Sequence, residues 1–274
     1  VIIGNLYCNP NRLTATGGLH LPERPCSPDH RQHQQHHLHQ SGTGTHAPEL
    51  CCRIFRHFPL RQIHSRERAL DIVTARPKID WGRFFFGAGI WAILSILTFA
   101  LTFLTGDNGD ITFRFEPSKF FVMLVIALLM FPFQTSFEEL VFRGYLMQWA
   151  YILFKNKWAA IILTGVIFGL MHSANPEVED FGMLLAMPQY ILMGLLLGYI
   201  AVQDNGLELS LGIHAANNIL SAITFTSPSS TLQTHALFVD PTPSASGWDT
   251  LFILISGLLF IWITNRKYRF VQRS

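Results

Sequence analysis

Three short motifs place charged or hydrogen-bonding side chains inside segments that are otherwise apolar. The side chains concerned are Glu138, Glu139, Arg143, His172, His214 and Asn218. A charged side chain at the centre of a bilayer costs about 2.5–3.5 kcal/mol on insertion scales, so such a residue is a candidate for function by default. A carboxylate can act as a general base towards water, and imidazole or amide groups can stabilise a developing oxyanion. These residue types are therefore typical of hydrolytic chemistry.

The motif SFEELVFRGYL follows the apolar run KFFVMLVIALLMFPFQT and contains two glutamates and an arginine. On a helix, Glu139 and Arg143 are four residues apart and share a face, whereas Glu138 is turned by about 100° from Glu139. Glu139 and Arg143 can therefore neutralise one another, which leaves Glu138 as a lone carboxylate that suits a general base. A purely structural Glu–Arg pair is the alternative interpretation.

Two further motifs, FGLMH and HAANN, lie in later apolar segments. Phe168 precedes His172 by one helical turn and can restrict the orientation of the imidazole, and His214 shares a helix face with Asn218. Either histidine alone could simply donate a hydrogen bond to a neighbouring helix. Close helix approach is predicted at two pairs of glycines, Gly165 with Gly169 and Gly194 with Gly198.

The composition indicates a membrane protein. The chain has 274 residues, of which 49% are hydrophobic and only 14% are charged, which is apolar for a globular protein. A formal charge of +2, without a basic stripe beside exposed aromatic residues, argues against a nucleic-acid partner. The cysteines contain no CxxC pair, so neither a disulfide framework nor a zinc knuckle is predicted; they are Cys8, Cys26, Cys51 and Cys52.

From Trp81 onward the chain consists of apolar runs that are separated by short polar loops. A transmembrane helix needs about 20 residues, and backbone groups in lipid must be satisfied within the helix. We therefore predict an all-α, polytopic membrane helix bundle of about six transmembrane helices, with the second interrupted at Pro132. The predicted spans are 82–104, 119–154, 158–172, 181–202, 207–225 and 248–264.

Basic residues predict the orientation of the bundle. They precede the first span, follow the second and follow the last: Arg76, Lys78, Arg83, Lys155, Lys157, Arg266, Lys267, Arg269 and Arg273. By the positive-inside rule these ends are cytoplasmic, together with both termini. The segment NPEVED and the loop 227–247 would face the opposite side. A simple drawing then places His172 at the far end of its span and His214 near the cytoplasmic start of another, at different depths.

Residues 1–75 have a different character. They contain nine of the twelve histidines, including the tract HRQHQQHHLHQ, and show no apolar period. Such a segment buries too little surface to offset its ordering entropy, so we predict a disordered extension, either an upstream addition or a truncation artefact. Metal binding by the histidine tract is the alternative to plain low-complexity sequence. The membrane domain is predicted at residues 76–274.

The order and spacing of EELVFR, FGLMH and HAANN resemble the CPBP family, also called Abi. This family comprises CAAX prenyl endopeptidases of type 2 and bacterial relatives that are linked to bacteriocin processing and immunity. The resemblance implies an intramembrane endopeptidase. It implies that Glu138 and His172 activate water, that His214 and Asn218 stabilise the oxyanion, and that Glu139 and Arg143 hold the site together.

The resemblance leaves the metal open. Members have been described both as metalloproteases and as metal-free glutamate proteases. A divalent metal such as zinc would be held by Glu138, His172 and His214, but the HExxH motif is absent from the sequence, and we expect no obligatory metal.

The rival functions are a transporter or proton relay and a non-catalytic membrane scaffold. The expected partners are the lipid bilayer and a peptide or membrane-protein substrate. The expected location is the bacterial inner membrane, as a multi-pass protein.

Overall fold

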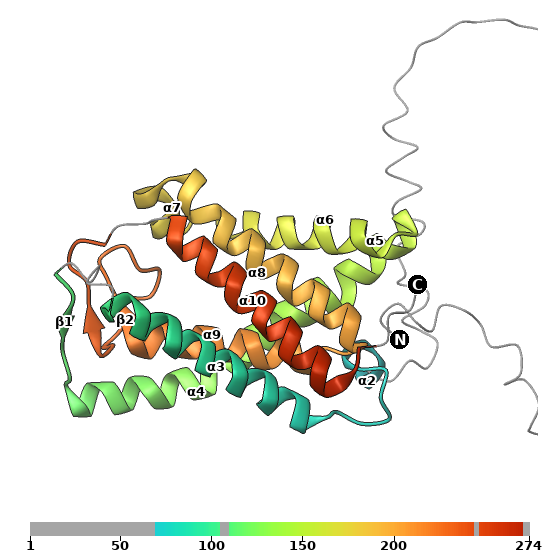
Figure 1. Ribbon diagram of the computed structural model, residues 1–274, viewed down its shortest axis with the longest axis horizontal. Coiled ribbons are helices and arrows are strands. Elements are labelled where there is room, and N and C mark those ends of the chain that lie inside the picture. The colour runs from blue at the N-terminus through green and yellow to red at the C-terminus, as the bar shows by residue number, and fades with distance from the viewer. Residues whose placement is uncertain (1–68, 105–109, 244–246, 271–274) are drawn as a thin grey trace, which may run out of the picture. The chain divides into compact units, whose positions relative to one another are not determined.

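The computed structural model describes residues 69–104, 110–243 and 247–270. The histidine-rich tract and all four cysteines lie outside these ranges, so the predictions for them stay predictions. Within the described residues the chain is mostly helical, which confirms the predicted helical bundle (Figure 1). The helices are α2 (Ala69–Val73), α3 (Trp81–Leu104), α4 (Pro117–Glu139), η3 (Leu140–Leu146), α5 (Met147–Phe154), α6 (Lys157–Leu170), α7 (Pro176–Phe181), α8 (Met183–Asp204), α9 (Glu208–Thr224) and α10 (Gly247–Tyr268).

Four of these helical segments are long and apolar enough to cross a membrane: Trp81–Leu101, Pro117–Phe154, Met183–Asp204 and Gly247–Tyr268. The expected count of about six spans is not confirmed. The third and fifth predicted spans correspond to shorter helices, because α6 has 14 residues and α9 has 17. His172 lies in the turn after α6 and not in the helix itself.

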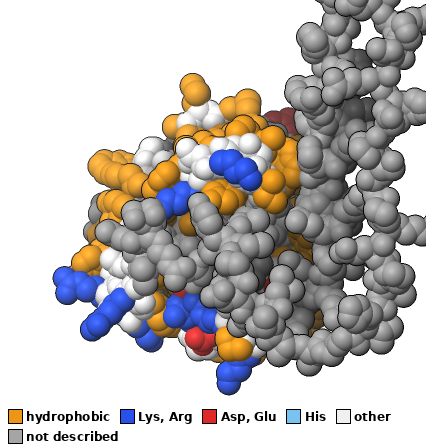
Figure 2. Space-filling view, turned by 90° about the vertical axis from the view of Figure 1, so that its right-hand side faces the viewer, with side chains coloured by type: hydrophobic (Ala, Val, Ile, Leu, Met, Phe, Trp, Pro, Cys, Tyr) orange, Lys and Arg blue, Asp and Glu red, His pale blue; other side chains and the backbone are white. Residues whose placement is uncertain are grey.

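Large apolar side chains face outward along the long helices. Leu104, Phe133 and Leu184 expose 83%, 77% and 91% of their surface. Figure 2 shows orange hydrophobic side chains over much of the described surface, with blue Lys and Arg side chains among them. Helices that are apolar on their outer faces as well as in the core are typical of a membrane setting. The chain is therefore an integral membrane protein.

The predicted interruption at Pro132 is wrong. Helix α4 continues through Pro132 to Glu139, as prolines in membrane helices are tolerated when their surroundings satisfy the freed backbone groups. The departure from α-helical geometry comes later, in the π-helical segment η3. Helices α4, η3 and α5 together form one segment of 38 residues.

Helices α6 and α8 approach each other closely at the glycines that the sequence singled out. A Cβ atom added at Gly194 would lie 2.6 Å from the carbonyl oxygen of Gly165, and one at Gly169 would lie 2.9 Å from the backbone nitrogen of Ile191. A side chain at either position would force the two backbones apart. The prediction that these glycines serve close helix packing is confirmed for Gly165, Gly169 and Gly194, whereas a Cβ atom at Gly198 would make only ordinary contacts, at 3.6 Å or more.

A buried ion cluster ties the segment before α3 to the junction of α8 and α9. Arg76 contacts Asp204 and Glu208 at 3.0 Å each, and Arg83 also pairs with Asp204. The side chains of both acidic residues are fully buried. We call Arg76, Arg83, Asp204 and Glu208 the junction cluster.

Helix α2 also packs against this junction. The Leu207 amide donates to the carbonyl of Val73, and Thr74 is fully buried. Residues 69–75, which the sequence assigned to the extension, are therefore part of the packed helical region.

Three two-residue strands form a small sheet that the sequence did not predict. Strand β3 (Phe238–Val239) lies between β1 (Thr112–Phe113) and β2 (Phe225–Thr226), antiparallel to the first and parallel to the second. The sheet connects the end of α9 to the loops before α4 and α10.

Candidate active site

A buried hub of three side chains joins α4, η3 and α9. Arg143 Nη1 donates to Glu139 Oε1 at 2.8 Å, and His214 Nδ1 donates to the same oxygen at 2.8 Å. Glu139 and Arg143 are completely buried and His214 is 4% exposed. The predicted pairing of Glu139 with Arg143 is confirmed. The same Glu139 carboxylate also fixes the orientation of the His214 imidazole, as carboxylates do in other histidine sites.

Arg143 extends the hub to two more helices. Its Nη2 donates to the carbonyl oxygen of Gly194 on α8 at 3.0 Å, and its Cζ lies 4.7 Å from the ring centroid of Phe168 on α6. The planar guanidinium can serve a carboxylate, a carbonyl and an aromatic face at once. One side chain thus sets the positions of α6 and α8 relative to η3.

The π-helical geometry begins directly after Glu139 and includes Arg143. Single π-helical turns are rare and occur frequently at functional sites. Gly144, in the same turn, allows α2 to approach, because a Cβ atom there would lie 2.8 Å from Cγ2 of Ile72. The segment that carries the charged motif is therefore locally distinct from an ordinary helix.

Glu138 stands apart from the ion pair, as the spacing predicted. Its Oε1 accepts a hydrogen bond from Gln134 Nε2 at 3.0 Å, and its Oε2 lies 3.6 Å from His214 Nε2. Its side chain is 21% exposed, whereas that of Glu139 is fully buried. Sequence reasoning missed Gln134, although its position four residues before Glu138 on the same helix was a usable signal.

His172 is held by its own helix and by α8. Its Nδ1 lies 2.8 Å from the carbonyl oxygen of Phe168, which can only accept, so Nδ1 carries the hydrogen. The imidazole stacks on Tyr190 with a centroid separation of 4.5 Å and an interplanar angle of 16°. The Tyr190 hydroxyl accepts a hydrogen bond from Asn175 at 3.2 Å. Sequence reasoning missed Tyr190 and Asn175.

Phe168 connects the two histidines. Its ring centroid lies 4.9 Å from that of His172 and 5.6 Å from that of His214. The two imidazoles, which a simple drawing put at different depths, therefore contact the same aromatic ring. One reason is that the Nδ1 hydrogen bond turns the His172 ring back towards α6.

A cavity of about 360 Å³ adjoins this cluster. Its lining includes Gln134, the hydrogen-bond partner of Glu138, and both His172 and Asn218. Further polar groups come from Asn175, Tyr190 and Asn217 and apolar ones from Phe131 and Phe225. At its edge, the amide and hydroxyl of Thr231 donate to Glu177 at 2.8 and 2.6 Å. The cavity is large enough for part of a peptide and brings mixed polar and apolar surfaces to the site.

Comparison with known proteins gives two matches. Residues 116–220, which carry all three motifs, match the family model described as type II CAAX prenyl endopeptidase Rce1-like. This part of the chain is therefore similar to that family. The resemblance to CAAX prenyl endopeptidases of type 2 is thereby confirmed.

One similar protein is YyaK of Bacillus subtilis (strain 168), an uncharacterized protein. It is 31% identical over 192 residues, which is 70% of this chain and 64% of YyaK. The chain thus spans less than two thirds of that relative's length. No solved structure gives a significant match.

The described residues do not group the zinc set that the sequence suggested into a metal site. Among the described residues, no three His, Cys, Asp or Glu side chains are grouped so that they could hold a metal ion. Glu138 and His214 lie together, whereas His172 lies on the other side of Phe168. The arrangement instead suits a proton acceptor at Glu138 beside fixed imidazole and amide groups.

Proposed function

We propose that this protein is an intramembrane endopeptidase that hydrolyses a peptide bond with a water molecule activated by Glu138. One observation carries the proposal. Glu139 is neutralised within the buried hub, whereas Glu138 has no arginine or lysine partner among the described residues and lies beside His214 and Gln134. A carboxylate in this setting is a suitable general base.

The proposed reaction needs only groups of this chain, a water molecule and the substrate. Glu138 accepts a proton from the water, the water oxygen bonds to the carbonyl carbon, and the carbonyl oxygen becomes an oxyanion. His172, whose neutral ring would leave Nε2 as an acceptor, orients the water. His214 and Asn218 donate to the oxyanion. The carbon–nitrogen bond then breaks, and the departing amine takes the proton from Glu138.

His214 serves this role through its second nitrogen. With Nδ1 donating to Glu139, Nε2 can donate to an oxyanion only in the imidazolium form. Two carboxylates flank the ring, Glu139 at 2.8 Å and Glu138 at 3.6 Å. The same geometry would hold the positive charge next to the developing negative one.

The proposed substrate is a peptide or a membrane-protein segment. A tail of a prenylated protein, a peptide precursor and a membrane-protein segment are the three candidates. The mixed lining of aromatic and polar side chains suits a peptide that enters from the lipid. We propose the same membrane orientation as the basic residues predict, with cytoplasmic termini.

The test compares membranes of a bacterial host that produces wild-type protein with membranes that contain Glu138→Gln. Quantitative proteomics of new peptide ends should find a bond that is cut only by the wild type. A farnesylated peptide ending in a CaaX sequence, with a fluorophore and a quencher on either side of the cysteine, tests the prenylated substrate directly. An unprenylated copy of the peptide serves as the comparison.

Glu138→Gln should lower the cleavage rate by about 10²–10⁴-fold, the usual contribution of a general base. The matched control is Glu116→Gln, which changes the glutamate that precedes α4 and pairs with Lys119 on the surface. It should retain full activity. Equal cutting by wild type and Glu138→Gln would reject the protease and favour a scaffold or transporter.

A further inference from the structure

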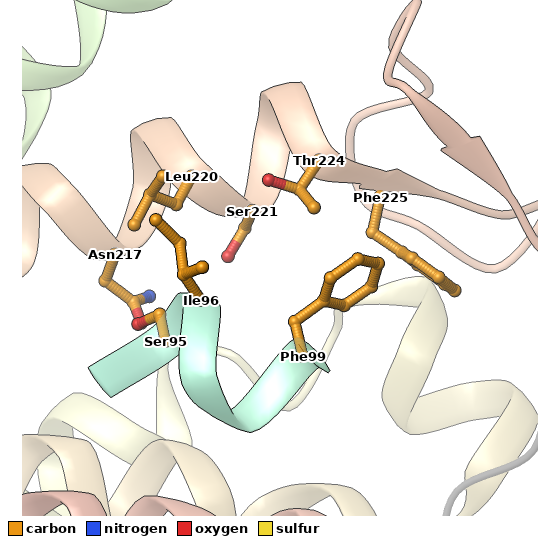
Figure 3. Close-up of a pocket in the computed structure, with 8 residues that line it drawn as sticks. All are labelled: Ser95, Ile96, Phe99, Asn217, Leu220, Ser221, Thr224 and Phe225. Atoms are coloured by element: carbon orange, nitrogen blue, oxygen red, sulfur yellow. The ribbon is translucent and has the colours of Figure 1, made fainter. Parts of the chain in front are cut away.

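Asn217 lies where three cavities meet. It lines the cavity of about 360 Å³ beside His172 and Asn218, a second of about 190 Å³ between α3 and α9, and a third of about 280 Å³ that α10 also lines. Figure 3 shows the cavity of about 190 Å³, with Asn217 and Ser221 on α9 pointing towards Ser95 and Ile96 on α3. An amide in this position faces the space next to the proposed oxyanion donor.

The orientation of the Asn217 amide is fixed by Trp91 on α3. Trp91 is 3% exposed, and its Nε1 donates to Asn217 Oδ1 at 3.2 Å. An indole nitrogen can only donate. The oxygen of the Asn217 amide must therefore face Trp91, and its NH₂ group must face away from it.

The NH₂ group of Asn217 in turn donates to Asn218 Oδ1 at 3.4 Å. With its oxygen engaged, Asn218 has its own NH₂ group left for other partners, and this group is what an oxyanion requires. A rotation of the Asn218 amide by 180° would instead present an oxygen lone pair to the oxyanion. The three residues form a relay that runs from α3 to the candidate active site.

We propose that Trp91 and Asn217 are positioning residues that keep the NH₂ group of Asn218 directed at the substrate oxyanion. This inference rests on the proposed function, because it assigns Asn218 the role of an oxyanion donor. It explains why a buried indole nitrogen on α3 is paired with an amide that borders all three cavities.

The first variant is Trp91→Phe. It removes the indole N–H and keeps an aromatic ring next to Phe260, which now lies in an edge contact at 6.2 Å. With the full chain in detergent micelles and the farnesylated reporter, kcat should fall about 10-fold while KM changes less than about twofold. The fall is smaller than the roughly 10²–10³-fold loss that follows complete removal of an oxyanion donor. If the wild type leaves that reporter intact, the probe is a peptide spanning the bond found by proteomics.

The second variant, Asn217→Asp, can accept from Trp91 but cannot donate to Asn218. It should lower kcat at least as much as Trp91→Phe. If Trp91→Phe does not fold, Asn217→Asp alone tests whether Asn218 needs the hydrogen bond from Asn217. The control is Trp262→Phe on α10, where the tryptophan is 57% exposed. It should leave kcat and KM unchanged.

A double-mutant cycle separates positioning from a general structural effect. In an Asn218→Ala background, Trp91→Phe should cause no further fall in kcat, because the group that it positions is gone. The relay is refuted if Trp91→Phe and Asn217→Asp keep the wild-type kcat, or if Trp91→Phe has the same effect with and without Asn218. These results leave the proposed function intact, provided that Glu138→Gln and Asn218→Ala each lower kcat by about 10²-fold or more. If those two variants keep the wild-type kcat, the function itself fails and the relay fails with it.

Discussion

Two buried ion clusters stabilise this protein, and they differ in one respect. The junction cluster contains two arginines and two buried carboxylates, and Arg83 also pairs with the more exposed carboxylate of Asp80 at 3.3 Å. The hub contains Glu139, Arg143 and His214, and a second carboxylate, that of Glu138, lies 3.6 Å from its histidine. The four junction residues line none of the three cavities described above, whereas Glu138 lies beside a lining residue, Gln134.

The comparison shows what distinguishes a structural ion cluster from a reactive one here. Both clusters bury carboxylates completely, and both use arginine. A buried charge is tolerated when it is paired and hydrogen-bonded. The additional carboxylate of the junction, Asp80, is paired with Arg83, whereas that of the hub, Glu138, has no arginine or lysine partner among the described residues and accepts a hydrogen bond from the cavity-lining Gln134. Burial alone therefore does not distinguish the two clusters.

The largest expected effect on stability is that of Arg143→Leu. The substitution leaves the Glu139 carboxylate completely buried with His214 as its remaining hydrogen-bond partner among the described residues. Removing one partner of a buried ion pair costs about 3–5 kcal/mol. Equilibrium unfolding in mixed detergent micelles should show a loss of this size, and the protein should be inactive.

A paired replacement sharpens this test. Replacing both members of a buried ion pair by apolar residues is often neutral in stability, so Glu139→Leu with Arg143→Leu should recover most of the unfolding free energy. Activity should not recover, because His214 has lost the carboxylate that orients it. A double variant that is both stable and active would show that the hub serves packing only.

The junction cluster should behave in the opposite way. Asp204→Asn removes the charge that faces Arg76 and Arg83, whose side chains are 23% and 17% exposed. Because water can partly compensate these arginines, the expected cost is about 2 kcal/mol, within the range for hydrogen bonds to charged groups. Cleavage of the reporter per folded molecule should stay within about twofold of wild type. The hub variants, in contrast, should lose activity.

The sequence predicted the contacts that follow from helical spacing. The pairing of Glu139 with Arg143 and the separation of Glu138 both come from residues within one turn of a single helix. The glycines of α6 and α8 were predicted to allow close packing because small residues in apolar helices usually do so. In each case the signal is local.

Contacts that depend on tertiary packing were not predictable. His214 and Glu139 are 75 residues apart, and Trp91 and Asn217 are 126 apart. Nothing in either local sequence specifies the partner, because the contact depends on how α9 packs against α3 and α4. The π-helical turn was also missed, since LVFRGYL reads as an ordinary apolar helix segment, and strands of two residues are too short to show a period.

The smallest expected effect concerns Tyr190, which contacts His172 at the edge of the cavity. Tyr190→Phe keeps the ring that stacks on His172 and removes the hydroxyl that accepts from Asn175. The expected cost is about 0.5–1.5 kcal/mol, that of a single neutral hydrogen bond, with a change in kcat of only a few-fold. Tyr190→Leu also removes the stack and should lower kcat further at similar stability. If the two variants lose equal activity, the hydroxyl matters and the stack does not, and the orientation of His172 would then depend on its hydrogen bond to Phe168 alone.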